Sequence, residues 1–263
     1  HVVDLETGEE ILNHNKKLIF TPASNMKLYT SAAALDLFGP MHRFHTTAGS
    51  PAAPDEGAVP SLVLRPGGDP VLKASDLREI ARRVRRELGI SRVEGDLVID
   101  LSLFDSPLKG PGWAWDDDPD YYNMSVSPLM LDYNLLAVSI APGDVGEPAE
   151  VSLSLPSEYP PIANLTTTVR GEATSITVTR KPFEGLIMVS GQIGHEARPY
   201  QEELTMHYPP EWAGLVFVEM LREEGVVIDG GPVLDRDGVA RDMAVEYKHL
   251  SPPLSRITAL FNK

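Results

Sequence analysis

Apolar residues recur at helical spacing in several stretches of the chain, with polar residues between them. The clearest apolar stripe lies in residues 75–88 and consists of Leu77, Ile80, Ala81, Val84 and Leu88. Arginines fill the outward positions, which is the pattern of an amphipathic helix with one buried face. Ser75 is the predicted cap of this helix, and Gly89 is its predicted end. Prolines predict the starts of two more helices, at Pro209 and Pro252.

Alternating apolar and polar residues predict strands elsewhere in the chain. Residues 2–20 have the pattern of a hairpin, and short strands are predicted at residues 62–64 and 97–101. Residues 48–60 have the composition of a loop. From residue 134 to residue 195 the pattern is strand-like throughout, without a stretch of helical spacing. This region is therefore predicted to be a small β unit.

A further helix is predicted over residues 27–38, which are rich in the good helix formers Ala and Leu. Thr21 can cap its start, and Pro22 suits the first helical position, where its missing N–H would have no partner anyway. Gly39-Pro40 ends the helix, because proline cannot continue it. Ser24 is therefore expected in the first turn, at the positive end of the helix dipole.

Lys27 follows Ser24 by three residues, on the same helix face and within reach of the serine hydroxyl. A serine hydroxyl is a poor nucleophile until a neighbouring base takes its proton. A lysine can be that base where burial and nearby positive charge lower its pKa, and Ser-x-x-Lys is the sequence form of the pair. A chance match is also expected in a chain of this length, and a second copy runs from Ser106 to Lys109. Proline and glycine flank that copy, so it is expected to be a loop, and Ser24 with Lys27 is the candidate catalytic pair.

Composition narrows the classes of function. The 263 residues can form one large domain or two smaller ones, and 42% of them are hydrophobic, an ordinary globular share. The formal net charge of −15, without a long basic cluster, argues against nucleic acid as a partner. The absence of cysteine excludes disulfides, thiol catalysis and thiolate metal sites. No apolar run approaches membrane-spanning length. The chain opens on a strand-like pattern without a signal peptide, so it is expected to have been trimmed at its start.

Five motifs follow one another along the chain. They are Pro22 to Thr30, Gly67-Gly68-Asp69-Pro70, Val93 to Asp100 followed by Phe104-Asp105, Gly112 to Asp117, and Ser251-Pro252-Pro253-Leu254. Together they closely resemble, in order, the landmarks of the class C low-molecular-mass penicillin-binding proteins, which are D-alanyl-D-alanine carboxypeptidases and endopeptidases. The resemblance covers essentially the whole chain, and five landmarks in order are far more specific than one tetrapeptide.

The resemblance implies an α/β (α+β) fold: a penicillin-binding transpeptidase-like domain of antiparallel sheet and helices, interrupted by two inserted domains. Residues 1–46 and 240–263 would form the transpeptidase-like domain, without its C-terminal part. Residues 47–145 and 200–239 would form the first inserted domain, and residues 146–199 a second, mostly β domain nested in it.

The resemblance also implies that Ser24 is the acylated nucleophile and that Lys27 accepts its proton. The substrate would be a peptidoglycan stem peptide ending in D-Ala-D-Ala, and β-lactams would acylate the same serine. The loop rich in tryptophan and acidic residues would approach a peptide side chain with a free amino group. Its candidate binding residues are Asp117, Asp116, Tyr122 and Trp115. A carboxylate beside an aromatic wall suits an ammonium group. No cofactor is implied, and the expected location is the bacterial periplasm or cell envelope.

Two motifs of the family, Ser-x-Asn and Lys-Thr-Gly, do not occur in the chain. By the family pattern the first should begin shortly after Lys263, so a C-terminal segment or a second chain is expected to carry both. The chain alone is therefore not expected to turn over substrate. The alternative function is a non-catalytic wall-binding or scaffolding relative of the same fold. A broader serine esterase or β-lactamase is a third possibility.

Two clusters have some features of metal sites. His42-Arg43-Phe44-His45 has no carboxylate at ligand spacing, so a strand that enters a new domain is the preferred interpretation. Asp116 to Asp120 lacks the alternating ligands and the glycine of a calcium loop. A solvated acidic loop or a substrate contact is preferred there, and no metal site is predicted.

Overall fold

A computed structural model describes most of the chain in two compact units. The described residues are 1–104, 109–110, 112–113, 123–155, 159–180, 185–206, 208–238 and 242–263. One unit consists of His1–His42 with Pro253–Lys263, and the other of Arg43–Pro252. The finer division of the inserted region into two domains stays a prediction.

The first unit contains a hairpin and two helices. Strands β1 (Val2–Val3) and β2 (Glu10–Leu12) pair in antiparallel fashion, which confirms the predicted hairpin over a shorter length. A short 3-10 helix, η1 (Ala23–Asn25), leads directly into α1 (Met26–Phe38). Gly39 ends α1 with a φ of 81°, as predicted, because glycine adopts positive φ without strain.

The last helix, α4 (Leu254–Phe261), packs against α1 in the same unit. It begins two residues later than Pro252, because Pro253 is extended, with a ψ of 149°. The side-chain amide of Asn262 donates a hydrogen bond of 2.9 Å to Ser31 Oγ, and Ser31 is the single buried residue of α1. This hydrogen bond is one polar contact between the two helices.

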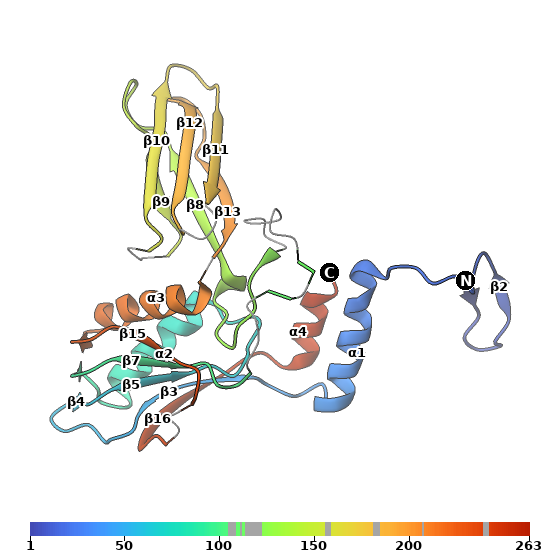
Figure 1. The fold of residues 1–263 in the computed structure, drawn as a ribbon, viewed down its shortest axis with the longest axis horizontal. Coiled ribbons are helices and arrows are strands. Elements are labelled where there is room, and N and C mark those ends of the chain that lie inside the picture. Colours follow the sequence, from blue (N-terminus) through green and yellow to red (C-terminus); the bar gives the residue numbers. More distant parts are fainter. Residues whose placement is uncertain are drawn as a thin grey trace. The chain divides into compact units, whose positions relative to one another are not determined.

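A five-stranded sheet forms the base of the second unit (Figure 1). Its order is β15 (Pro232–Asp235), β7 (Leu97–Asp100), β5 (Leu62–Arg65), β3 (His45–Ser50) and β16 (Val245–Leu250). The first three strands are parallel, and β3 and β16 are each antiparallel to their neighbours. A smaller parallel sheet joins β14 (Val227–Ile228), β6 (Arg92–Val93) and β4 (Ala58–Val59).

The loop predicted for residues 48–60 was wrong at both ends, because β3 reaches Ser50 and β4 begins at Ala58. Small residues in β3 caused the error, since they suggest a loop by composition. Gly49 instead allows β3 and β16 to approach closely, because a Cβ at this position would lie 2.2 Å from the carbonyl oxygen of Val245 in β16.

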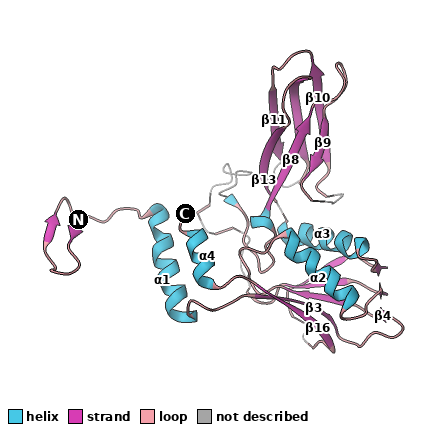
Figure 2. Cartoon of the chain, turned by 180° about the vertical axis from the view of Figure 1, so that it is seen from behind, coloured by secondary structure: helices cyan, strands magenta, loops and turns pink. Residues whose placement is uncertain are grey.

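Helices α2 (Ala74–Arg86) and α3 (Pro209–Glu223) pack on one face of this sheet (Figures 1 and 2). The predicted apolar stripe of α2 is confirmed for Leu77, Ile80, Ala81 and Val84, which are buried, but the helix ends at Arg86, before Leu88 and Gly89. The predicted cap was wrong: Lys73, not Ser75, precedes the helix, and its N–H donates to the carboxylate of Asp76 at 2.9 Å. Gly214 of α3 lies so close to the sheet that a Cβ would be 2.4 Å from Ile99 Cδ1.

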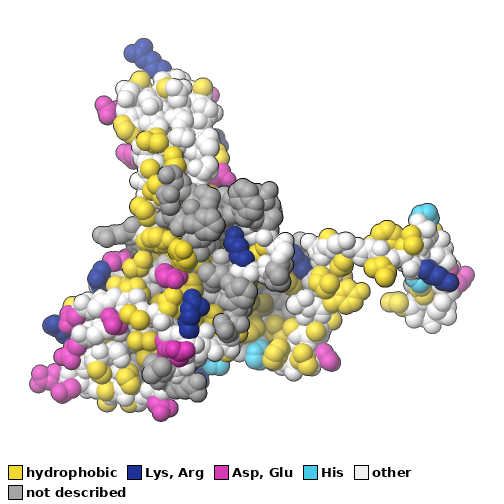
Figure 3. Space-filling model, in the orientation of Figure 1, with side chains coloured by type: hydrophobic (Ala, Val, Ile, Leu, Met, Phe, Trp, Pro, Cys, Tyr) yellow, Lys and Arg dark blue, Asp and Glu magenta, His cyan; other side chains and the backbone are white. Residues whose placement is uncertain are grey.

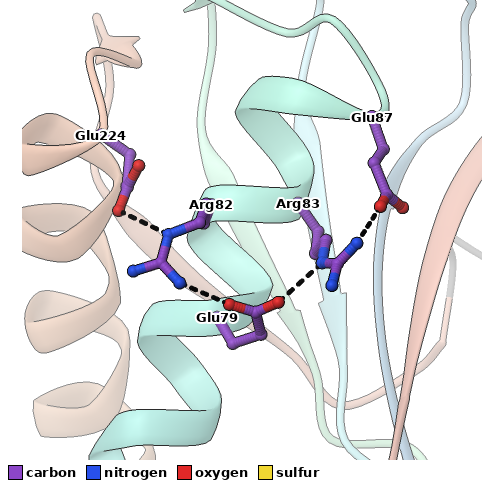
Figure 4. A network of polar contacts seen from close by, with 5 residues as sticks. All are labelled: Glu79, Arg82, Arg83, Glu87 and Glu224. Carbon is purple, nitrogen blue, oxygen red and sulfur yellow. Dashed lines mark hydrogen bonds and ion pairs between the residues drawn. The ribbon is translucent and has the colours of Figure 1, made fainter.

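Ion pairs connect the outer faces of α2 and α3 (Figure 4). Arg82 pairs with Glu79 at 2.6 Å on its own helix and with Glu224, just after α3, at 3.4 Å. Arg83 pairs with Glu79 at 2.7 Å and also with Glu87. These side chains are partly exposed, so each pair contributes little stability compared with the buried stripe beneath them.

The remaining strands of the second unit form two three-stranded sheets, drawn in magenta in Figure 2. One has the order β13 (Tyr200–Thr205), β8 (Leu135–Ala141) and β9 (Glu150–Leu153). The other has the order β10 (Ile162–Val169), β12 (Ile187–Gly194) and β11 (Ser175–Arg180). This confirms the strand-like character predicted from residue 134 onward. Among the described residues, none of the helices combines the length and apolar character needed to cross a membrane.

Candidate active site

Ser24 lies in η1, and Lys27 lies in the first turn of α1 that follows it. The turn is closed by backbone hydrogen bonds, since the N–H of Asn25 donates to the carbonyl of Pro22 at 3.0 Å. Thr21 was wrongly predicted as the cap, because Pro22 flanks the helix start in helical conformation and no side chain caps it. The structure therefore confirms the helical setting of the pair but not the predicted cap.

The residue just before Ser24 has a strained backbone. Ala23 has a φ of 47°, in the left-handed region that L-residues with a Cβ seldom adopt. Such a conformation costs about 1–2 kcal/mol and persists only where the surrounding structure enforces it. Strained residues of this kind concentrate at functional sites, and this one immediately precedes the candidate nucleophile.

The Ser24 side chain is exposed, and Lys27 is partly buried. Their three-residue spacing places both side chains on one face of the helical segment. The first turn of α1 holds no acidic residue, so the positive end of its dipole keeps its full effect. The Lys27 ammonium lies 5.5 Å from the ring centroid of Phe261 in α4, and no described carboxylate pairs with it.

Large apolar side chains are exposed on α1, which carries Lys27, and on α4, which packs against α1 (Figure 3). They are Met26, Leu28, Tyr29, Leu37 and Phe38 of α1, and Leu260 and Phe261 of α4. Exposed apolar side chains that gather on one part of a protein mark a place where another polypeptide or a ligand can pack.

The four predicted substrate-binding residues, Trp115, Asp116, Asp117 and Tyr122, lie outside the described residues. The chain that follows them is well buried: Asn123, Ser125 and Ser127 are each 3% exposed.

Residues 123–131, here called the strap, precede β8 in the chain and are mostly buried, although Val126 is exposed. The side chain of Asn134 holds the strap in place through two hydrogen bonds. Its Nδ2 donates to Ser125 O at 2.8 Å, and its Oδ1 accepts from the Leu131 N–H at 3.2 Å. Asp132, Tyr133 and Asn134 all have positive φ, between 45° and 59°. Three such residues in succession form a short segment with a strained backbone, which the hydrogen bonds of the buried Asn134 amide stabilise.

The Gly67-Gly68-Asp69 turn lies against both the strap and the sheet. A Cβ on Gly67 would lie 2.1 Å from the carbonyl oxygen of His45, so only glycine fits. The N–H of Gly68 donates to Pro128 O of the strap at 3.2 Å. Burial raises the pKa of the Asp69 carboxyl, although a hydrogen bond from the Val71 N–H and the nearby His249 oppose this shift. The motif therefore joins the strap to the end of β5.

Sequence reasoning missed an ion pair between the partly exposed Arg65 and the buried Asp100. Arg65 Nε donates to Asp100 Oδ2 at 2.8 Å, and Ser102 donates to Asp100 Oδ1 from its hydroxyl at 2.6 Å and its N–H at 3.0 Å. Burial acts to raise the pKa of Asp100, but the hydrogen bonds from Ser102 and Arg65 outweigh it and lower the pKa. The signal in the sequence was one charged residue directly after each apolar strand pattern.

Neither histidine of the sequence motif His42 to His45 joins a metal-like cluster in the described part of the chain. His45 begins β3, which confirms the interpretation of this motif as the entry to a strand. The cluster Asp116 to Asp120 lies outside the described residues.

Comparisons with known proteins agree with the resemblance. The D-Ala-D-Ala carboxypeptidase 3 (S13) family matches residues 1–263. The D-alanyl-D-alanine carboxypeptidase of Actinomadura sp. (strain R39) is 35% identical over 273 residues, which cover 100% of this chain and 50% of that protein.

Solved structures show the same fold. Penicillin-binding protein 4 from Haemophilus influenzae superposes with a TM-score of 0.78 at 23% identity, covering 97% of this chain and 56% of that one. A second structure of that protein, complexed with a β-lactam, gives a TM-score of 0.70 at 20% identity, covering 97% and 55%. This chain thus spans about half the length of these relatives. The likeness confirms the mixed α/β fold, and the match over its whole length shows that the chain belongs to the D-Ala-D-Ala carboxypeptidase 3 (S13) family.

Proposed function

We propose that this chain carries the nucleophile of a serine-type D-Ala-D-Ala carboxypeptidase or endopeptidase that acts on peptidoglycan stem peptides. The observation that carries the proposal is the exposed Ser24 one helical turn before Lys27, in a chain that belongs to the family. The strained Ala23 beside Ser24 supports it, because backbone strain gathers at reacting groups.

The proposed reaction has two steps. Ser24 Oγ attacks the carbonyl carbon of the terminal D-Ala-D-Ala bond while Lys27 accepts the hydroxyl proton. The backbone N–H of Ser24 supplies one donor to the oxyanion. The C–N bond then breaks as Lys27 returns the hydroxyl proton to the leaving nitrogen, so that the terminal D-Ala leaves as the amine and an ester remains on Ser24. Water hydrolyses this ester and releases the shortened peptide.

The site needs further polypeptide, which we propose carries the Ser-x-Asn and Lys-Thr-Gly motifs as a C-terminal segment or a second chain. The exposed apolar side chains of α1 and α4 support this part of the proposal, because exposed apolar side chains that gather together mark sites of interaction with another polypeptide. The relatives supply a second argument, since this chain spans about half their length.

Substrate selection is assigned to the acidic segment. Asp117, with Asp116, Tyr122 and Trp115, would bind a free amino group on the peptide side chain, since a carboxylate and an aromatic face both attract an ammonium ion. β-Lactams would acylate Ser24, by analogy with the β-lactam complex of the Haemophilus influenzae protein. The proposed place of action is the bacterial periplasm or cell envelope.

Labelling with a fluorescent penicillin tests the proposal. The preparation combines this chain with the polypeptide that supplies the two missing motifs. A stable adduct on Ser24 is expected, and Ser24→Ala should abolish it. Lys27→Ala should slow labelling by about a hundredfold or more, because general-base catalysis contributes on that scale. Ser106→Ala, in the second Ser-x-x-Lys copy, is the matched control and should label normally.

A non-catalytic wall-binding or scaffolding relative remains the alternative function. Absence of labelling in the complete, folded preparation would favour it and refute the acyl-transfer proposal. In a serine esterase or β-lactamase, Ser24 would also be acylated, but the ester would be hydrolysed quickly. A label that appears on Ser24 and is then rapidly lost would therefore indicate that class.

A further inference from the structure

A cavity of about 380 Å³ opens in the second unit at the end of its five-stranded sheet. Residues from three neighbouring strands or the turns that follow them line it: His45 of β3, Arg65, Pro66 and Gly67 at the end of β5, and Asp100, Ser102 and Leu103 at the end of β7. Strands β5 and β7 are parallel, so their carboxyl ends lie side by side here, whereas β3 runs antiparallel to β5. The carboxyl ends of parallel strands are a recurrent place for small-molecule sites.

The cavity lies on the sheet face away from the helices. Ile99 of β7 points toward α3, as its proximity to Gly214 requires. Successive side chains of a strand point to opposite faces, so Asp100 faces away from α3. Strand register places Arg65 beside Asp100 and Thr47 beside Arg65, so the side chain of His45, two residues before Thr47, projects from the same face.

The chemistry of the lining is that of a site for a neutral, polar ligand. The Arg65 guanidinium and the Asp100 carboxylate neutralise each other, and hydrogen bonds from Ser102 hold the carboxylate fixed. A strongly charged ligand would therefore find no net countercharge when it loses water. The exposed His45 ring can donate or accept a hydrogen bond, and the Ser102 hydroxyl, whose proton is donated to Asp100, can accept one from a ligand hydroxyl group.

Apolar surface completes the cavity. Leu103 is 55% exposed and forms part of the wall, together with Pro66. Alternating apolar surface and hydrogen-bonding groups match a sugar ring, which has C–H faces and a rim of hydroxyl groups. The volume lies at the small end of the range for ligand sites, about 300–1,000 Å³, and suits one sugar unit rather than a long peptide.

We propose that this cavity binds a neutral N-acetylated amino-sugar unit, with the acetyl methyl against Leu103 and Pro66 and the hydroxyl groups toward Ser102 and His45. The choice of this sugar rests on the proposed function, since N-acetylated amino sugars form the glycan to which stem peptides are attached. The cavity would then hold the glycan strand independently of the peptide that reaches Ser24.

The test is a titration of this chain with tri-N-acetylchitotriose, in which the amide chemical shifts in ¹H–¹⁵N spectra report binding. Saturable shifts are expected at Gly67, Ser102 and Leu103. Leu103→Asp places a charge in the apolar wall and should weaken binding by about tenfold or more. Leu165→Asp is the matched control, because Leu165 is an exposed leucine in β10, outside the cavity lining, and should leave the affinity unchanged.

Three results would overturn the inference: no saturable shift in the wild-type chain, equal affinity of the Leu103→Asp and Leu165→Asp variants, or equal binding of cellotriose, which lacks the acetamido group. Spectra of each variant verify that it is folded. Ser24→Ala should bind the sugar normally, so failure of penicillin labelling and failure of sugar binding are separate outcomes.

Discussion

Gly67 is a residue whose identity the fold constrains closely. A Cβ at this position would lie 2.1 Å from a backbone oxygen of His45, which cannot move without disturbing β3. We therefore expect Gly67→Ala to lower the free energy of unfolding by about 1–3 kcal/mol or more, the usual cost of overpacking. Urea unfolding measures the change. Gly231→Ala is the control, since nothing lies within 4 Å of a Cβ there, and equal effects of the two substitutions would contradict the structure.

Two buried carboxyl groups predict opposite dependences of stability on pH. Burial raises the pKa of Asp69 in the folded chain above its ordinary value of 3.8, so its favourable contribution is present at low pH and is lost as the pH rises through the folded pKa. The pKa of Asp100 is lowered despite burial, by hydrogen bonds from Ser102 and Arg65. The contribution of Asp100 is therefore present above its ordinary pKa and is lost as the pH falls through the folded pKa.

The substitutions Asp69→Asn and Asp100→Asn separate these effects in urea unfolding at several pH values. Relative to the wild type, Asp69→Asn should become progressively more stable as the pH rises from about 4 to about 7. Asp100→Asn should be less stable than the wild type at neutral pH, and the difference should shrink toward acid pH. Parallel pH profiles of the two variants would show that one of the assigned shifts is wrong.

At the residue scale, local chemistry could be predicted and long-range chemistry could not. Ser24 and Lys27 are three residues apart, so helical spacing alone places them on one face. Arg65 and Asp100 are 35 residues apart and meet only because β5 pairs with β7 in a particular register. No pattern within either strand specifies that register, so the ion pair and its cavity needed the structure.

At the scale of elements, helix α2 shows which contacts hold a helix on the sheet. Ile80 is fully buried, whereas Arg82 forms partly exposed ion pairs with Glu79 and Glu224. We expect Ile80→Ala to lower the free energy of unfolding by about 2–5 kcal/mol, through lost burial and a residual cavity. Arg82→Ala should cost at most about 1 kcal/mol, because exposed pairs lose little when separated. A larger loss for Arg82→Ala in thermal or urea unfolding would mean that the ion pairs, not the apolar stripe, hold α2.

Helices were predictable as elements because periodic apolar residues and terminal prolines and glycines act locally. The ends of strands were harder to predict from the sequence. The error at residues 48–60 arose because Gly49 signals a loop by composition, while its actual role is a close approach to Val245. The cap of α2 was misplaced from Lys73 to Ser75 because serine is a favoured cap, but the carboxylate of Asp76 supplies the cap hydrogen bond from inside the helix.

At the scale of the whole molecule, stability is unevenly distributed between two helices of equal length. Both α1 and α2 have 13 residues, but α1 buries only Ser31, whereas α2 buries four apolar residues. An isolated helix of this length is marginal in water, so its persistence depends on packing. The helix that carries Lys27, and follows directly on Ser24, is therefore the less stabilised of the two.

Amide hydrogen exchange can measure this difference within one molecule. We expect amides of α1 to exchange at least about a hundredfold faster than those of α2, because local opening of α1 exposes little apolar surface. Addition of the polypeptide that we propose covers α1 and α4 should slow exchange in α1 and leave α2 unchanged, which makes α2 the internal control. Equal protection of both helices in this chain alone would show that α1 needs no further covering, and the incomplete-site proposal would lose its main structural support.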